Sequence, residues 1–165
     1  MSTPPRLREP AHRVSPRARL MWAAVGLIEV LVLLGAPQLF WARIHDWQHA
    51  WSLPMAIASG VVAAAYLVGM PAWRYRVHRW EATPTAVYTQ SGWLSQERRI
   101  APLSRIQTVD VRRGPVAQLF RLASVRVTTA SAAGALEIHG LESADADRLA
   151  EQLTAAAAAE RGDAT

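Results

Sequence analysis

Two long apolar segments, joined by a short polar loop, constrain this chain more than any other feature of its sequence. The first covers residues 20–42 and contains a single charged residue, Glu29, and the second covers residues 53–73 and contains none. About 20 apolar residues in a helix span the hydrocarbon core of a bilayer, which is about 30 Å thick. The sequence therefore predicts a two-helix transmembrane hairpin over residues 20–73.

Two other interpretations of these segments are weaker. A cleaved signal peptide over residues 20–36 would have a shorter apolar run and no second span after it. Two buried helices of a soluble protein would show more charge and would lack tryptophan and arginine at their ends.

Arginine asymmetry predicts the orientation of the hairpin. Cytoplasmic loops carry an excess of basic residues, and here Arg43 is the single arginine of the loop between the spans. Both termini are therefore expected in the cytoplasm, in a multi-pass protein of a bacterial inner membrane. The flanking arginines are Arg6, Arg8, Arg13, Arg17 and Arg19 before the first span, and Arg74, Arg76 and Arg79 after the second.

Composition excludes several classes of function. The chain has no cysteine, and all 18 basic residues are arginine, so cysteine nucleophiles, thiolate metal sites and catalytic lysines are absent. We find no motif for a nucleophile, a phosphate-binding loop or paired catalytic carboxylates, and we expect neither enzymatic activity, cofactor nor small-molecule substrate. His45 and His49 have the spacing of metal ligands on a helix, but two imidazoles in a short loop favour a solvated role.

The remaining segments differ from the two spans in residue composition and hydrophobic pattern. Residues 1–19 are rich in proline and arginine and predict a disordered basic cytoplasmic tail. Residues 74–159 contain short alternating segments separated by turn signals such as Ser91-Gly92, which predict an antiparallel sheet or small barrel. Ser143 is expected to cap a C-terminal helix, and residues 160–165 are expected to be a disordered tail.

The segment from Pro102 to Ala130, PLSRIQTVDVRRGPVAQLFRLASVRVTTA, resembles a known family. Its Arg-Ile-Gln, Gly-Pro and Leu-Ala elements occur in the order and spacing typical of bacterial pleckstrin-homology-like membrane proteins, the YdbS-like group. The two preceding spans agree with that architecture. The resemblance implies that residues 74–159 form a seven-stranded, strongly bent antiparallel sheet or partly open barrel, which the C-terminal helix caps. Arg121 stands where the family usually has glycine.

Glu29 is the most unusual residue of the first span. It lies about nine residues into the helix, so about 13 Å from the cytoplasmic edge. An intramembrane carboxylate is expected to have a hydrogen-bonding partner or a function. Counting back from Trp73 places Tyr66 at the same depth in an antiparallel hairpin. Packing against Tyr66 or a neighbouring subunit, a proton relay and contact with an accessory partner all remain open.

Small residues repeat at four-residue spacing on the second span. Ala56, Gly60 and Ala64 would let another helix approach closely, either the first span or a second copy of the chain. Alanine-rich composition explains the same pattern without a function. Gly35 and Pro37 predict a kink in the first span.

We expect a non-enzymatic, membrane-anchored binding or scaffold module that engages a protein partner, another copy of itself or the anionic headgroups of membrane lipids. The alternative is a subunit of a transport or export system with Glu29 as its intramembrane polar site. No aromatic platform accompanies the arginines, so nucleic acid is not an expected partner. The candidate headgroup or partner-binding residues are Arg74, Arg76, Arg79, Arg98, Arg99, Arg105, Arg112 and Arg113.

Overall fold

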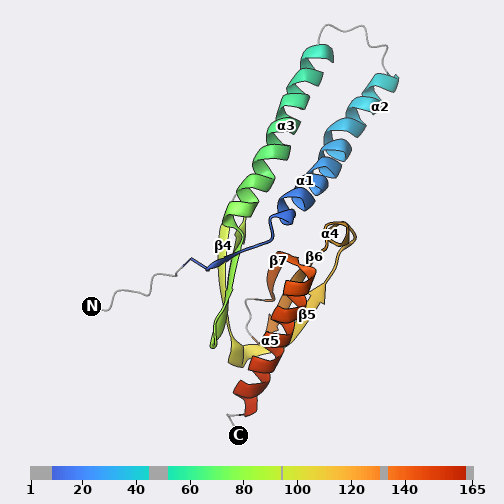
Figure 1. Cartoon of the computed structure of the whole chain (residues 1–165). Helices are drawn as coiled ribbons and strands as arrows, with labels where there is room; N and C mark the ends of the chain where they lie inside the picture. The colour runs from blue at the N-terminus through green and yellow to red at the C-terminus, as the bar shows by residue number, and fades with distance from the viewer. Residues whose placement is uncertain (1–8, 45–51, 94, 131–133, 163–165) are drawn as a thin grey trace, which may run out of the picture.

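Two long helical arms extend from a domain of two β-sheets and a C-terminal helix (Figure 1). The computed structural model describes residues 9–44, 52–93, 95–130 and 134–162. The first arm consists of α1 (Arg17–Val30), the π-helix η1 (Leu31–Gly35) and α2 (Ala36–Ile44), and the second arm is α3 (Ser52–Val77).

Both arms are long and apolar enough to cross a membrane. In their most apolar windows only 11% of the first arm and 6% of the second is buried within the chain. Leu33 is 69% exposed and Val68 is 74% exposed, which an apolar solvent would allow and water would not. The helices are therefore not core helices of a soluble protein. They begin and end outside the predicted bounds, since α1 starts at Arg17 and α3 continues to Val77.

The first arm widens into a π turn just before Pro37. The N–H of Ala36 bonds to the carbonyl of Leu31, five residues back, rather than four. Proline has no N–H, so Pro37 cannot donate to the carbonyl of Leu33. The predicted irregularity is therefore a π turn over Leu31–Gly35, located where a proline interrupts the helical ladder.

The N-terminal segment corrects the prediction of a disordered tail over residues 1–19. Strand β1 (His12–Arg13) pairs antiparallel with β2 (Arg79–Ala82), and the next residue, Val14, is 4% exposed. The N–H of Ser15 donates to the carbonyl of Gly140 at 2.9 Å. Charge and proline content suggested disorder, but contacts with residues far away in the sequence hold residues 9–16 in an ordered structure. Residues 1–8 lie outside the described part.

The domain contains two antiparallel sheets instead of the single seven-stranded sheet that was expected. The first has the order β1-β2-β3-β4, and the second has the order β5-β6-β7. Between them, Pro102 and the 3-10 turn η2 (Leu103–Arg105) interrupt the ladder, so β4 does not pair with β5. The strands are β3 (Ala86–Gly92), β4 (Gln96–Pro102), β5 (Ile106–Arg112), β6 (Leu122–Thr129) and β7 (Leu136–Glu142).

Two helices complete the domain. The short helix α4 (Pro115–Leu119) connects β5 to β6, and α5 (Ser143–Gly162) covers the sheets. Leu149 and Leu153 of α5 pack with Val87, Val125 and the other buried residues of the main core. Because α5 extends to Gly162, residues 160–162 are helical and not part of a disordered tail, and residues 163–165 lie outside the described part.

A second hydrophobic cluster joins the helical arms to the domain. It contains Val14, Ala18, Trp22, Met70 and Leu122, which come from the N-terminal segment, α1, α3 and β6. At its edge, Gly140 has φ +76°, and a Cβ atom there would lie 2.8 Å from the Cβ of Ala18. Only glycine allows α1 to approach β7 so closely.

We expect Gly140→Ala to weaken this joint more than Gly134→Ala. Both glycines have similar positive φ values, so both substitutions carry a backbone cost of about 1–2 kcal/mol. No atom lies within 4 Å of a Cβ at Gly134, whereas Gly140 meets Ala18. Overpacking should cost the Gly140 variant a further 1–3 kcal/mol or so. Thermal unfolding of both variants in lipid nanodiscs measures the difference, and equal losses would contradict it.

Candidate functional site

Glu29 and Tyr66 meet between the two arms, at the depth where the sequence placed them both. The Tyr66 hydroxyl donates to Glu29 Oε2 at 2.6 Å. An open groove of about 280 Å³ adjoins the pair, and its other lining residues are all apolar: Val30, Leu33, Leu34, Val62 and Ala63. The pair is therefore a polar contact at the edge of an apolar, lipid-facing groove.

A second polar contact links the arms farther from the domain. Gln38 Nε2 donates to Ser59 Oγ at 2.7 Å, and Ser59 Oγ donates in turn to the carbonyl of Met55 at 2.8 Å. Interhelical hydrogen bonds of this kind contribute modestly to the association of membrane helices. The two contacts set the register of the first arm against α3.

The small-residue stripe does not face the first arm. Ala56, Gly60 and Ala64 are all exposed, and no atom lies within 4 Å of a Cβ built at Gly60. The close approach occurs instead at Gly26, where a Cβ would lie 3.2 Å from Met70 and 3.3 Å from Tyr66. Of the two roles predicted for the stripe, packing against the first span is thus incorrect, and contact with a second copy stays a prediction.

A group of aromatic and basic side chains lies where the arms enter the domain. The Arg74 guanidinium lies 5.0 Å from the Trp22 ring centroid, and the Trp22 and His78 rings are 4.9 Å apart. Trp22 is only 3% exposed, so its ring packs inside the joint and does not face lipid. This stacking gives Arg74 a structural position within the joint.

Two histidines lie beside this group: His78 is buried and His139 is half-buried. His78 Nδ1 donates to the carbonyl of Arg74 at 2.8 Å, and burial lowers the pKa of His78 to about 4. Burial also lowers the pKa of His139, whose Nδ1 lies 3.1 Å from the Ser124 hydroxyl. Desolvation disfavours the charged imidazolium, so the His78 ring is neutral at pH 7.

The turn between β3 and β4 lies against α3 above the last arginines of that helix. The Trp73 indole N–H donates to the carbonyl of Trp93 at 2.7 Å, and the Trp93 ring meets the Tyr66 ring edge-on at 5.9 Å. Positions 66 and 73 are separated by about 10 Å along the helix axis. Trp93, which is 41% exposed, therefore lies beside the membrane-spanning part of α3.

Gly92 makes this turn possible. It has φ +132°, and a Cβ there would lie 1.9 Å from the carbonyl oxygen of Ser95. A residue with a side chain cannot occupy this position without opening the turn. The Ser91-Gly92 signal predicted the turn, but nothing in the sequence linked it to α3.

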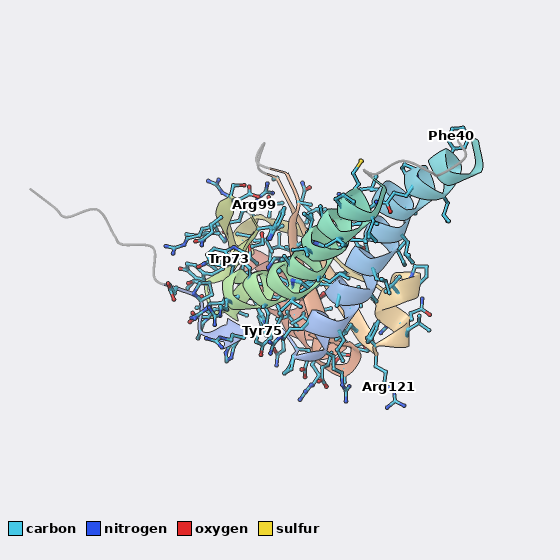
Figure 2. All side chains as sticks on the ribbon, turned by 90° about the horizontal axis from the view of Figure 1, so that it is seen from above. Phe40, Trp73, Tyr75, Arg99 and Arg121 are labelled. Carbon is cyan, nitrogen blue, oxygen red and sulfur yellow. The ribbon has the colours of Figure 1, made fainter. Side chains whose placement is uncertain are left out.

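The helix α4 lies on another side of the arms, beside the start of α1 (Figure 1). Ala117 and Phe120 pack against the cluster that contains Ala18 and Trp22, while Leu119 is 81% exposed. Arg121 follows with φ +56°, the left-handed conformation that explains why the resembling family usually has glycine here. Its side chain points away from the molecule, opposite Arg99 when seen from the membrane side (Figure 2).

The candidate arginines do not form one continuous basic surface. Arg74 and Arg79 are at the joint, where Arg79 forms an ion pair with Glu9 at 3.2 Å, and Arg76 is exposed on α3. Arg112 is exposed at the end of β5, and Arg113 next to it binds both carboxylate oxygens of Asp147 at 2.6 and 2.8 Å. The remaining three lie together elsewhere: Arg98, Arg99 and Arg105.

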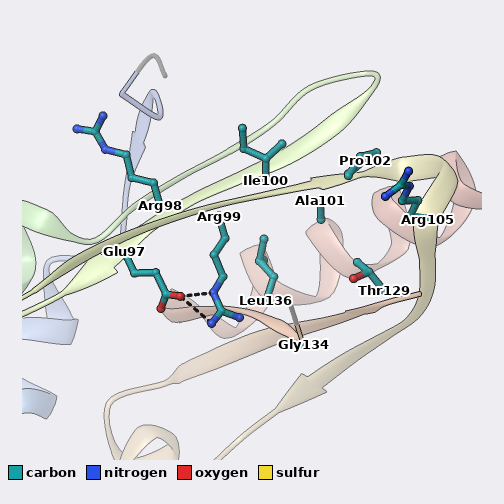
Figure 3. Close-up of a pocket in the computed structure, with 10 residues that line it drawn as sticks. All are labelled: Glu97, Arg98, Arg99, Ile100, Ala101, Pro102, Arg105, Thr129, Gly134 and Leu136. Atoms are coloured by element: carbon teal, nitrogen blue, oxygen red, sulfur yellow. Dashed lines mark hydrogen bonds and ion pairs between the residues drawn. The ribbon is translucent and has the colours of Figure 1, made fainter. Parts of the chain in front are cut away.

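These three arginines line a cavity of about 370 Å³ in the seam between the sheets. Figure 3 shows β4 on one side and the strand with Leu136 on the other, with the Arg99 side chain extending between them. The Arg99 guanidinium contacts Glu97 at 2.7 Å and donates to the carbonyl of Ala135 at 2.9 Å. The sequence identified the arginines, but not the seam, because the seam exists only when the two sheets diverge.

The described part of the chain contains no group of three or more potential metal ligands. His45 and His49 lie outside the described residues, so their weakly metal-like spacing stays untested. Sequence reasoning missed four positions, because their surroundings depend on how elements distant along the chain come together: Trp93, Leu119, His78 and His139.

Comparisons with known proteins agree with this architecture. A family model described as a bacterial PH domain matches residues 23–157. The transmembrane protein YdbS of Bacillus subtilis (strain 168) is 29% identical over 153 residues, and the match covers 88% of this chain and 92% of that protein. No solved structure matches the chain.

We expect the Glu29–Tyr66 contact to stabilise the hairpin by the amount typical of interhelical hydrogen bonds. A double-mutant cycle with Glu29→Leu and Tyr66→Phe should give a coupling energy of about 0.6–1.7 kcal/mol in thermal unfolding in nanodiscs. Glu29→Gln keeps an acceptor for the tyrosine hydroxyl and should lose less stability than Glu29→Leu. A coupling energy of zero would show that the contact does not hold the arms together.

Burial of neutral His78 predicts lower stability in acid. Between pH 6.5 and about 4 the unfolded chain binds a proton at this histidine that the folded chain does not. The free energy of unfolding therefore falls as the pH falls through this window, by about 3 kcal/mol at most for this group. Chemical unfolding at pH 7 and pH 4.5 should show a smaller difference for His78→Asn than for the wild type. The exposed-histidine control His12→Asn should retain the wild-type difference.

Proposed function

Because the chain belongs to the bacterial PH domain family, we propose that it is a non-enzymatic membrane-anchored scaffold whose domain rests against the inner leaflet of the cytoplasmic membrane. In this arrangement both termini are cytoplasmic, as the arginine asymmetry favours. The hairpin supplies the anchor, and the domain supplies the binding surfaces for lipid headgroups and a partner protein.

The observation that carries this proposal is that two exposed apolar side chains lie beside the membrane-spanning helices. Trp93 lies beside the membrane-spanning part of α3, and Leu119 extends from a helix packed beside the first turns of α1. Tryptophan favours the membrane interface, where its ring is buried and its N–H can still reach polar partners. A leucine that is 81% exposed is unfavourable in water and favourable at the edge of the hydrocarbon.

Three exposed arginines lie close along the chain to these contacts: Arg76 follows Trp73, Arg112 precedes α4, and Arg121 follows Leu119. Each basic residue near an anionic leaflet contributes about 1 kcal/mol to membrane attraction. Trp93 and Leu119 lie on different sides of the arms. Their two apolar contacts, together with the nearby arginines, would orient the domain against the leaflet. Anchoring by the hairpin keeps the domain at high effective concentration near other membrane proteins, so weak contacts suffice.

The alternative, a transport subunit with a path past Glu29, has less support. The groove beside Glu29 is lined by apolar side chains and opens to the side of the hairpin, and no polar residue besides Glu29 and Tyr66 lines it. A hydrated path would need further polar groups along the arms. The geometry thus favours a packing role for Glu29 within an anchor.

Spin labels at single cysteines test the proposed contact with the leaflet. The native chain contains no cysteine, so labels on Ser95→Cys and Leu119→Cys report one position each. Both sites are exposed, and the matched control Glu151→Cys is exposed on α5. In nanodiscs with anionic lipid, labels at 95 and 119 should collide more with oxygen than with a polar nickel complex, whereas the label at 151 should show the reverse. Water-like values at both 95 and 119 would exclude the proposal.

A further inference from the structure

The outer edge of β4 is a candidate pairing surface for another strand. β4 is the last strand of its four-stranded sheet, with β3 on one side and the seam on the other. An edge strand presents N–H and C=O groups that can pair with another chain. Ile100, near the middle of this edge, is 44% exposed.

The register shows which groups of β4 point into the seam. The N–H of Leu103 donates to the carbonyl of Thr85, and hydrogen-bonded pairs alternate along an antiparallel ladder. The partner of Ile100 in the register, Tyr88, is therefore in a non-hydrogen-bonded pair. It follows that the N–H and C=O of Ile100 point away from β3, toward the seam.

The seam has space and charge for a ligand strand. Its cavity of about 370 Å³ is lined by apolar surface, including Ala101 and Leu136, and by Arg98, Arg99 and Arg105 against a single acid, Glu97. Arg105 is exposed at the far end of the cavity, next to Pro102 (Figure 3). Opposite charges on neighbouring strands stabilise their pairing, so the lining favours an acidic ligand.

The position of the seam favours a peptide over a lipid headgroup. β4 begins just after the turn that contacts α3 and runs away from the arms (Figure 1). At about 3.3 Å per residue, Ile100 lies about 13 Å from the first residue of the strand, Gln96. With Trp93 at the level of the bilayer interface, the centre of the seam lies on the cytoplasmic side of the headgroups.

We propose that this seam binds an extended acidic segment of a cytoplasmic partner protein, which pairs with the outer edge of β4 as an added strand. The inference rests on the proposed scaffold function, since the hairpin and the proposed leaflet contacts of Trp93 and Leu119 orient the seam toward the cytoplasm. Main-chain pairing at Ile100 supplies affinity, and Arg99 and Arg105 select acidic side chains in the added strand.

The test uses the full-length protein in nanodiscs of zwitterionic lipid and a fluorescent peptide of about ten residues that alternates glutamate and threonine. Fluorescence anisotropy measures its binding. Ile100→Pro removes the N–H that faces the seam, and Pro102 already occupies an equivalent position two residues along the strand. We expect this variant to bind at least about fivefold more weakly, as the loss of one main-chain hydrogen bond predicts.

Charge reversal gives a second and independent variant. Arg105→Glu should weaken binding at least about fivefold, whereas Arg148→Glu, an equal charge change at an exposed position of α5 outside the seam, should leave it within twofold or so of the wild type. A peptide that alternates lysine and threonine should not bind. Thermal unfolding confirms that each variant is folded, and if Ile100→Pro is not, the pair of charge reversals decides the outcome.

The inference would be overturned by no binding of the acidic peptide to the wild type, by equal weakening in Arg105→Glu and Arg148→Glu, or by wild-type binding in a folded Ile100→Pro variant. A spin label at Ile100→Cys that reads as membrane-embedded would assign the seam to lipid instead. Labels at 95 and 119 test the scaffold itself, so peptide binding can fail while the membrane contact is retained, and the two failures are distinguishable.

Discussion

The close contact between α1 and β7 is the constraint on which the rest of the structure depends. Gly140 lets Ala18 approach the strand to a distance that no side chain would allow, and Ser15 bonds to the carbonyl of the same glycine. Val14 and Trp22 then become buried beside Met70 of α3. A hairpin that would otherwise be linked to the domain through the end of α3 alone is held at two places, so the domain has a defined orientation relative to the helical arms.

The features with functional potential follow from this orientation. Trp93 reaches Tyr66 and Trp73 only because β3 and β4 rise alongside α3, and Leu119 reaches the level of α1 only because Phe120 packs into the joint. The same orientation places the seam beside Arg99 away from the arms (Figure 1). The proposed membrane contact and the proposed partner site therefore lie at opposite ends of the first sheet and would not compete for one surface.

Individual residues show where sequence reasoning succeeded and where it failed. Glu29 and Tyr66 were paired correctly because depth in an antiparallel hairpin follows from counting at 1.5 Å per residue. The rotation of α3 was not predictable in this way, so Ala56, Gly60 and Ala64 turned out to face away from the first arm. The burial of Trp22 was not predictable either, because Arg74 and His78, whose side chains contact its ring, lie far along the chain.

The sequence by itself determined the two membrane-spanning helices, the antiparallel strands after them and the C-terminal helix, because hydrophobic length and periodicity are local properties of a chain. It also indicated the family through a contiguous motif. Only the tertiary structure decided that residues 9–16 are ordered, that the strands divide into two sheets, and that Arg98, Arg99 and Arg105 share a cavity. Those outcomes depend on contacts between residues far apart in sequence, such as Ser15 with Gly140, whose free energy no local pattern records.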